Sequence, residues 1–234
     1  MFKSIKANLK KYINASSDFG FYRLLKKELK GYKSVLDVGC GVNSPLAKID
    51  KFFYLEGIDL VPIKSNKRIY DKSIKGNTLP MEQYESKIHD KYVRGNILNI
   101  EEYYKDKSFD VVVLFHVLEH LKRSVGKAFL EKLENIAKYK IIICTPNGFV
   151  PQDPLYGNIY QEHISGWYIK DFKARGYKTY GLRGFKFIRG EFAAIKYKPW
   201  YIWLFLSYLS EYVTIPFSQL AFELMAVKTL THKL

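Results

Sequence analysis

The sequence has only two cysteines, and no internal repeat or low-complexity segment, among its 234 residues. Cys40 and Cys144 each fall in or beside a predicted strand, and two thiols cannot form the disulfide framework of a small secreted protein. Neither has a second Cys or a His at metal-ligand spacing, which argues against a cysteine metal site. The first residues, Met1–Lys6, lack the long apolar core of a secretory signal. We therefore expect reduced thiols and a cytoplasmic location.

Acidic side chains are also scarce. The sequence has 38 Lys and Arg against 23 Asp and Glu, which gives a formal net charge of +15. Such a charge favours binding to a polyanion or to an anionic membrane surface. A lysine-rich surface also follows from genome composition or from thermal adaptation, so the charge alone leaves the partner open.

An uninterrupted membrane-spanning run is missing too. A span needs about 20 apolar residues, and Trp200–Phe222 is long enough, but Glu211 lies near its centre and Pro216 breaks its second half. The composition instead predicts an apolar helical insertion, at about residues 190–222, that covers a ligand pocket, packs in a dimer or lies in a membrane interface. Its tryptophans and tyrosines, which stand beside lysines, suit the interface.

Basic residues gather near the N-terminus. Residues 1–33 hold nine basic side chains against two acidic ones. Apolar residues recur at helical spacing over residues 2–13 and again over Phe21–Leu29, which predicts two helices. We expect residues 1–32 to form N-terminal basic helices and residues 33–234 to form one domain. The helices either pack on that domain with a solvated basic face or touch anionic lipid or nucleic acid.

From residue 33 onward, segments typical of strands and helices alternate. Apolar segments before Pro146 predict strands at 35–38, 53–59, 91–97, 109–115 and 140–145. Helices are predicted between them at about 45–51 and 125–139, and two further strands at 178–182 and 224–228. Continuous apolar strands are covered on both faces, so the pattern predicts an α/β fold with a mostly parallel sheet flanked by helices. In such sheets the ligand binds beyond the carboxyl ends of the strands.

A glycine-rich turn follows the first of these strands. The sequence Val35-Leu36-Asp37-Val38-Gly39-Cys40-Gly41-Val42-Asn43 runs from the strand into a helix start at Ser44-Pro45. Ser44 can cap that helix, and Pro45 fits its first position, where no N–H is needed. A strand that passes through glycines into a helix N-terminus lets backbone approach a ligand closely, although the motif alone is a weak signal.

Four segments at these strand ends together resemble the class I S-adenosylmethionine-dependent methyltransferases, especially the methyltransferase type 11 branch. They are the glycine-rich turn, Gly57-Ile58-Asp59, Arg94-Gly95-Asn96-Ile97-Leu98, and Ser108–Val113 running into Val117–Leu121. The resemblance covers about residues 33–185. It implies a Rossmann-like, seven-stranded, mostly parallel sheet, with the insertion before the last strand, and S-adenosylmethionine as cofactor.

The resemblance also implies a cofactor site along these strand ends. In such folds an acid about 20 residues after the glycine-rich motif binds the ribose diol. Asp59, 22 positions after Asp37, meets this expectation. Asp37 would act through the loop or through water on the amino group. Asn43 replaces the third glycine of the family and tolerates left-handed backbone, and Asn96 replaces an acid but can bind the adenine amino group through its amide oxygen. The predicted cofactor residues are Asp37, Gly39, Cys40, Gly41, Asp59, Leu60, Asn96, Ile97, Phe115 and His116.

Three histidines follow the fourth and fifth strands. Methyl transfer from a sulfonium is a direct displacement that depends on positioning, and a general base assists a hydroxyl acceptor. His163, in a His-x-x-x-Trp stretch that resembles the border of the family's acceptor pocket, is our first candidate for the base, with His120 and His116 as the others. A local role for Glu119 and His120 at a helix start is the alternative. A metal held by Glu119, His120 and His163 is compatible with the family, but the spacing does not demand one, and we predict none.

These observations predict O-methylation of a sugar or lipid-linked acceptor at or near the cytoplasmic face of a membrane. The alternatives are a tRNA or rRNA methyltransferase, a methyltransferase of a small lipophilic molecule, and a non-catalytic scaffold that binds a partner through Trp200–Phe222. Against a nucleic-acid amino-methyltransferase, Phe115-His116-Val117-Leu118 stands where an Asn/Asp-Pro-Pro-Tyr signature is expected. The sequence leaves the oligomeric state open.

Overall fold

The computed structural model describes residues 19–41, 44–60, 88–154 and 159–230 of the chain. The helix predicted over residues 2–13 lies outside them, as do Val42 and Asn43 of the glycine-rich turn.

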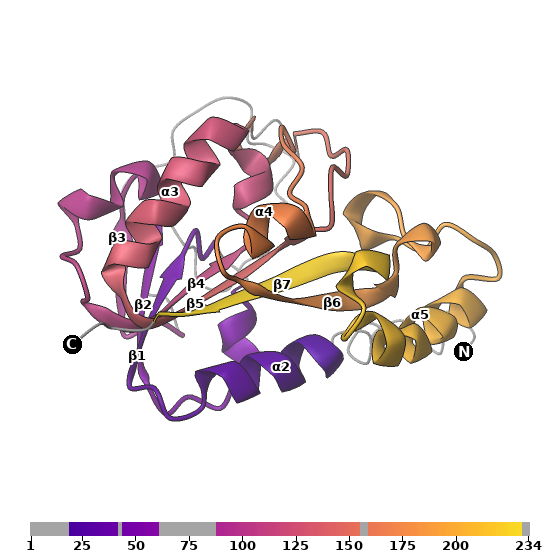
Figure 1. Ribbon diagram of the computed structural model, residues 1–234, viewed down its shortest axis with the longest axis horizontal. Coiled ribbons are helices and arrows are strands. Elements are labelled where there is room, and N and C mark those ends of the chain that lie inside the picture. Colours follow the sequence, from indigo (N-terminus) through magenta and orange to yellow (C-terminus); the bar gives the residue numbers. More distant parts are fainter. Residues whose placement is uncertain (1–18, 42–43, 61–87, 155–158, 231–234) are drawn as a thin grey trace, which may run out of the picture.

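Seven strands form one mixed sheet in the order β3-β2-β1-β4-β5-β7-β6 (Figure 1). Neighbours from β3 to β5 run parallel, whereas β7 pairs antiparallel with both β5 and β6. The predicted α/β fold with a mostly parallel sheet is therefore confirmed. The strands are β1 (Ser34–Val38), β2 (Tyr54–Asp59), β3 (Lys91–Arg94), β4 (Phe109–Phe115), β5 (Ala137–Pro146), β6 (Lys178–Phe185) and β7 (Ala221–Thr229).

Helices cover both faces of the sheet. α3 (Arg123–Ile136) and α4 (Ile169–Lys173) lie over one face and α2 (Phe19–Leu29) over the other (Figure 1). α3 buries the apolar stripe expected from its helical spacing, namely Phe129, Leu130, Leu133 and Ile136. α2 buries Leu24, Leu25 and Leu29 in a cluster that includes residues of β1, β2, β4 and β5. The sheet thus lies between two apolar layers.

Several boundaries differ by a few residues from the sequence prediction, and two of the differences have a clear physical cause. β5 begins at Ala137, ahead of the predicted start at Lys140, because Ala137 already pairs with Phe109 of β4. The helix predicted at about 45–51 is a short 3-10 helix, η1 (Pro45–Lys48), because the backbone at Ile49 is already extended. The Ser44 side chain caps it as expected, by accepting a bond from the Leu46 N–H at 3.2 Å.

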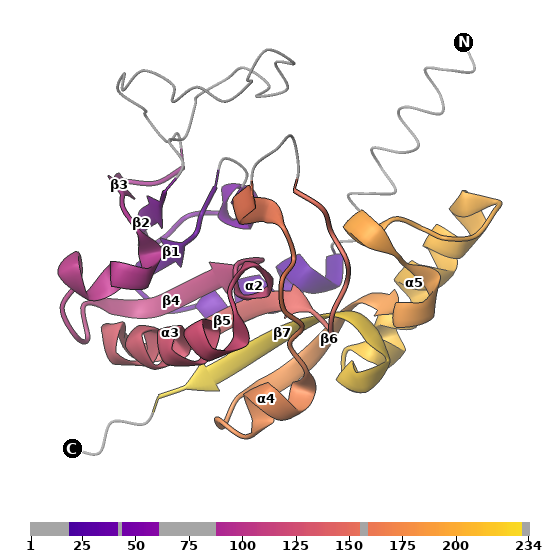
Figure 2. The same ribbon diagram turned by 90° about the horizontal axis from the view of Figure 1, so that it is seen from above.

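The strand order places the functional edge. The chain leaves β1 toward β2 and β3, and then returns to β4 on the other side of β1. Ligands of such sheets bind at this reversal, beyond the carboxyl ends of the strands. Because Pro146 at the end of β5 pairs with Glu223 at the start of β7, the segment that joins β6 to β7 meets the same edge. α5 (Trp200–Thr214) lies in that segment, as predicted for the insertion (Figure 2).

α5 buries its polar side and exposes much of its apolar side. Ser207, Ser210, Glu211 and Thr214 are buried at helical spacing. The large apolar side chains of the helix's other side are exposed, namely Tyr201, Ile202, Phe205, Leu206, Leu209, Tyr212 and Val213. We call these seven residues the outer face of α5. Most surface helices have the opposite arrangement.

An irregularity in β6 explains the buried polar side. The register of β6 against β7 shifts between Leu182 and Phe185, and Arg183 has a φ of 60°. Backbone groups freed by this shift bond to α5. The Arg183 N–H donates to Glu211 at 3.0 Å, the Phe185 N–H donates to the Ser210 hydroxyl at 3.0 Å, and Ser207 donates to the Arg183 carbonyl at 2.9 Å. The polar residues of α5 therefore satisfy buried backbone.

None of the helices within the described residues is both long enough and apolar enough to cross a membrane.

Candidate active site

The glycine-rich turn and Asp59 meet at the carboxyl ends of β1 and β2. Gly39 has a φ of 68°, and a Cβ atom there would lie 2.4 Å from Cγ2 of Val117. Only glycine fits this combination of left-handed backbone and close approach. The Gly41 N–H donates to a carboxylate oxygen of Asp59 at 2.9 Å, which fixes the turn against the acid. The structure thus brings together the predicted residues Gly39, Gly41 and Asp59.

Asp37 is buried beneath this turn, with 1% of its surface exposed. One carboxylate oxygen accepts a bond from the Ser44 hydroxyl at 2.5 Å and lies 3.1 Å from Nε2 of His89. The other oxygen is buried and has no hydrogen-bond partner within the part of the chain that the structure describes. A buried acceptor without a partner costs about 1–3 kcal/mol, so it fits a donated bond from a ligand such as an amino group.

The other predicted cofactor residues lie nearby but contribute differently. Burial raises the pKa of the Cys40 thiol, so it stays protonated. Leu60 is 38% exposed directly after β2. The amide oxygen of Asn96 already accepts a bond from the Leu98 N–H at 3.0 Å, and Ile97 packs against the core. The Phe115 ring is buried against Phe21 of α2, with ring centroids 5.8 Å apart. A cofactor contact for each of these residues stays a prediction.

His116 is held between two carboxylates directly after β4. Its Nδ1 lies 3.1 Å from Glu119 and its Nε2 lies 3.5 Å from Glu223 of β7. Partial burial alone would lower the pKa of His116, but the charges of Glu223 and Glu119 outweigh it and raise the pKa to about 10. A His that is already protonated at neutral pH cannot accept a proton, so His116 is the weakest of the three candidates for the base.

Sequence reasoning missed several residues that support this arrangement. Arg183 of β6 donates to Glu223 at 2.5 Å, and Thr145 of β5 donates to Glu119 at 3.0 Å. His89 also had no signal, because 52 positions separate it from Asp37. The sequence held one indication of these contacts, which is Glu223 within the apolar strand β7. A buried carboxylate needs hydrogen-bond or charge partners.

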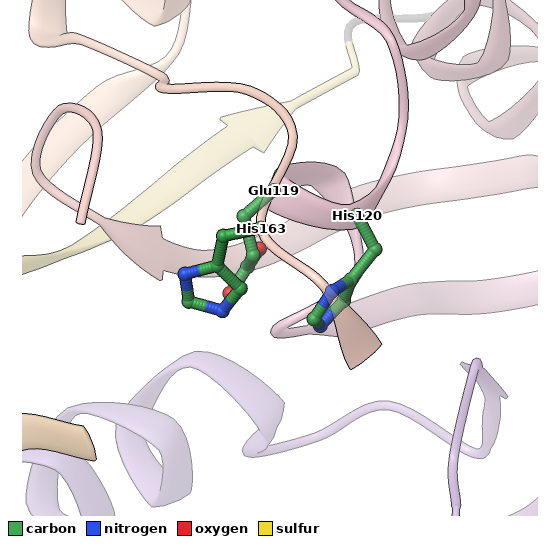
Figure 3. Close-up of side chains that lie close together, drawn as sticks. All are labelled: Glu119, His120 and His163. Atoms are coloured by element: carbon green, nitrogen blue, oxygen red, sulfur yellow. The ribbon is translucent and has the colours of Figure 1, made fainter. Parts of the chain in front are cut away.

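His120 and His163 lie side by side beside Glu119 (Figure 3). Glu119 and His120 belong to the 3-10 helix η3 (Leu118–His120), which follows β4. The segment with His163 is fixed to η3 by the N–H groups of Ile164 and Ser165, which donate to the Glu119 carbonyl at 2.9 and 3.1 Å. The rings of His120 and His163 are therefore close, with centroids 4.9 Å apart.

Both histidines have a defined ring tautomer. Nδ1 of His120 lies 2.9 Å from the Glu162 carbonyl, and Nδ1 of His163 lies 2.7 Å from the Val150 carbonyl. A carbonyl only accepts, so each Nδ1 carries the proton and each neutral ring has its lone pair on Nε2. Burial lowers the pKa of His163, which keeps that ring neutral near pH 7. The site thus holds two imidazole nitrogens that can accept a proton or bind a cation.

Comparison with known proteins agrees with this geometry. The profile of the family described as "Methyltransferase domain" matches residues 14–182, which is more than half of the chain. Among proteins of curated function, none matches the sequence.

Two solved structures show the same fold. One is an S-adenosylmethionine-dependent methyltransferase from Archaeoglobus fulgidus, with 18% identity, a TM-score of 0.50 and coverage of 98% of this chain and 95% of that one. Another belongs to a complex between the Haloferax volcanii Trm112 methyltransferase activator and a methyltransferase, with 12% identity, a TM-score of 0.53 and coverage of 99% and 96%. The chain therefore belongs to the methyltransferase domain family and is a class I methyltransferase that uses S-adenosylmethionine, as its strand-end motifs predicted.

Proposed function

We propose that this enzyme methylates a hydroxyl group of a sugar or lipid-linked acceptor at a membrane surface, on the cytoplasmic side. The observation that carries the proposal is the outer face of α5. Single exposed apolar side chains are ordinary, but a contiguous apolar face marks an interaction site. Apolar and aromatic residues on one side of a helix suit the boundary between lipid headgroups and acyl chains. This helix bonds to the end of β6, at the same edge of the sheet as the proposed active site.

The chain's own residues account for donor binding. We assign the donor site to the glycine-rich turn, with Asp59 facing the ribose diol and the unpaired oxygen of Asp37 facing the amino group. S-adenosylmethionine supplies an electrophilic methyl group on a sulfonium when it is bound. Holding the acceptor oxygen in line with that methyl contributes most of the acceleration, about 7–11 kcal/mol for well-oriented groups.

We assign Nε2 of His163 as the general base that accepts the proton of the acceptor hydroxyl when no metal ion is bound. As the acceptor oxygen bonds to the methyl carbon, the carbon–sulfur bond breaks and its electron pair stays on sulfur. The hydroxyl proton then needs a base, and His163 is neutral with a free lone pair. General-base assistance of this kind contributes about 100- to 10,000-fold. His120 offers a second nitrogen of the same tautomer, whereas His116 is already protonated.

Transfer of a tritiated methyl group to fractionated cell extract tests the acceptor. We expect the label in the fraction extracted by lipid solvent, with no effect of nuclease treatment. Label that stays in the aqueous phase and disappears with nuclease would overturn the proposal in favour of the RNA alternative. The net charge of +15 is the observation that favours this second candidate.

Vesicle flotation tests the membrane contact. Wild-type protein should float with vesicles of anionic phospholipid, and a smaller fraction of the Phe205→Ser and Leu209→Ser double variant should float with them. Phe52→Ser is the matched control, because Phe52 is 66% exposed and precedes β2, outside the outer face of α5. If the α5 double variant floats as well as wild type, or changes only self-association, α5 is not a membrane contact.

A further inference from the structure

The cluster formed by Glu119, His120 and His163 has the composition of a metal centre. One oxygen or nitrogen from each side chain can be chosen so that all three atoms lie within 4.8 Å of one another. The three side chains come from two segments, η3 and the loop before α4, and they point toward a common space (Figure 3). Groups of exposed acidic residues are common without a bound ion. This cluster differs from them, because Glu119 is buried and both rings are partly buried.

The histidines are oriented as metal ligands are. A His that binds a metal usually donates its other ring N–H to a backbone carbonyl or a carboxylate, which fixes the tautomer. Both rings do so here, through Nδ1 to the carbonyls of Glu162 and Val150. Nε2 of each ring is therefore the lone-pair nitrogen, in two rings whose centroids are 4.9 Å apart. Each of two independent segments thus presents an imidazole nitrogen with a lone pair that can bind a metal ion.

The carboxylate of Glu119 is also oriented from outside. The Thr145 hydroxyl donates to one of its oxygens at 3.0 Å, and Nδ1 of His116 lies 3.1 Å from the other. Carboxylate ligands of metals are themselves held by hydrogen bonds of this type. Glu119 is 2% exposed, so an ion would have one side of the site protected from water.

We propose that Glu119, His120 and His163 bind a divalent transition-metal ion, with the histidines coordinating through Nε2. Two imidazoles and one carboxylate favour Zn²⁺, Mn²⁺, Fe²⁺ or Co²⁺ over Mg²⁺ and Ca²⁺, which prefer oxygen ligands alone. Zinc lies about 2.0–2.2 Å from such atoms, which places neighbouring ligand atoms roughly 3–3.5 Å apart. The present separations reach up to 4.8 Å, so the side chains would have to draw closer together to bind the ion.

Three protein ligands leave coordination positions open, as in catalytic rather than structural metal sites. The inference deepens the proposed function, because an acceptor hydroxyl that occupies an open position would have its pKa lowered by the ion. The hydroxyl then loses its proton to solvent water, its oxygen bonds to the methyl carbon, and the sulfur keeps the electron pair. In the metal-bound enzyme His163 is a metal ligand, so it does not also act as the general base. It also departs from the sequence-based expectation of no metal.

Direct metal binding tests the site without reference to any acceptor. Chelator-treated full-length protein is titrated with Co²⁺, which is followed by its visible absorption, and with Zn²⁺ by calorimetry. We expect one ion per chain, and affinity at least 10-fold weaker in His163→Ala and in His120→Ala. Glu131→Ala is the control, because Glu131 is a potential ligand on α3 that is 67% exposed and pairs with Arg175 outside the cluster, and it should bind as wild type does.

Binding of S-adenosylhomocysteine, measured on each variant, shows that the variants are folded and that the donor site is intact. Absence of Co²⁺ and Zn²⁺ binding by wild-type protein would overturn the metal site even if no variant folds, and so would equal affinity in wild type and His163→Ala. Methyl transfer that survives chelation without loss would remove the catalytic role. Metal binding together with failed transfer to lipid fractions would instead count against the proposed acceptor alone.

Discussion

Individual residues at the proposed donor site have a geometry that their neighbours impose. Gly39 meets Val117, Gly41 donates to Asp59, and Asp37 is held by Ser44 and His89. These contacts join the ends of β1, β2 and β4, so a change at one residue should affect both the loop and the ligand. Two substitutions separate those effects.

Gly39→Ala should destabilise the protein and weaken donor binding. The added Cβ would lie 2.4 Å from Val117, at a φ of 68°. Overpacking and left-handed backbone together cost about 2–5 kcal/mol, which urea unfolding measures. Adding Val117→Ala should recover the steric part and leave about 1–2 kcal/mol for the backbone. Equal stability of Gly39→Ala and wild type would contradict the close approach.

Asp59→Asn should weaken binding of S-adenosylhomocysteine by at least 10-fold, because a charged acceptor is worth about 1.5–3 kcal/mol per hydrogen bond. Isothermal calorimetry on the purified protein measures the change. Asp50→Asn is a suitable control, since Asp50 has a side chain that is 83% exposed and pairs with Lys26. Unchanged affinity in Asp59→Asn would remove Asp59 from the donor site.

At the scale of elements, α5 is fixed to the sheet by an unusual buried acid. Glu211 accepts bonds from the N–H groups of Arg183 in β6 and Gly20 in α2. Burial raises its pKa from the ordinary 4.5 to about 7, although those bonds partly oppose the rise. The residue that interrupts the apolar run in the sequence is therefore the one that holds the helix in place.

Glu211→Gln should make stability less dependent on pH. Because the pKa is raised on folding, the contribution of Glu211 is fully present below pH 4.5 and is lost as pH rises through about 7. Wild type should therefore lose about 2 kcal/mol from this group between pH 5 and 8, and the variant should not. Urea unfolding at the two pH values measures this difference, and identical pH profiles of the two proteins would contradict it.

Across the whole molecule, two terms should act together at a membrane. The net charge of +15 attracts an anionic surface and is screened by salt, whereas the outer face of α5 acts by burial of apolar area. The two terms respond differently to ionic strength, which makes them separable in a single assay.

Binding to anionic vesicles should therefore fall between 0.1 and 1 M salt, where the Debye length shrinks from about 10 to about 3 Å. At high salt it should approach the level found with zwitterionic vesicles and no lower. Co-sedimentation at both salt concentrations measures the two levels. Complete loss of vesicle binding at high salt would show that charge alone drives the binding and that α5 does not contribute.

Sequence patterns were sufficient for the fold, and they predicted that the glycine-rich turn and Asp59 meet at one edge of the sheet. Period and composition located the strands, since a buried strand such as β4 has a continuous apolar run over Val111–Phe115. The turn at Gly39–Gly41 and the acid at Asp59 were found because their spacing follows from the strand–helix connection itself. Neither the exposed side of α5 nor the partner of Asp37 follows from such local rules.

What the sequence by itself determined is therefore the sheet, the donor and the class of reaction. Only the tertiary structure decided the charge of His116, because that charge depends on Glu223, which another strand brings to its side. It also placed His163 beside Glu119 and His120, and turned the apolar side of α5 outward. Local spacing encodes backbone conformation, whereas ligand sets and surface faces depend on contacts between residues far apart in the chain.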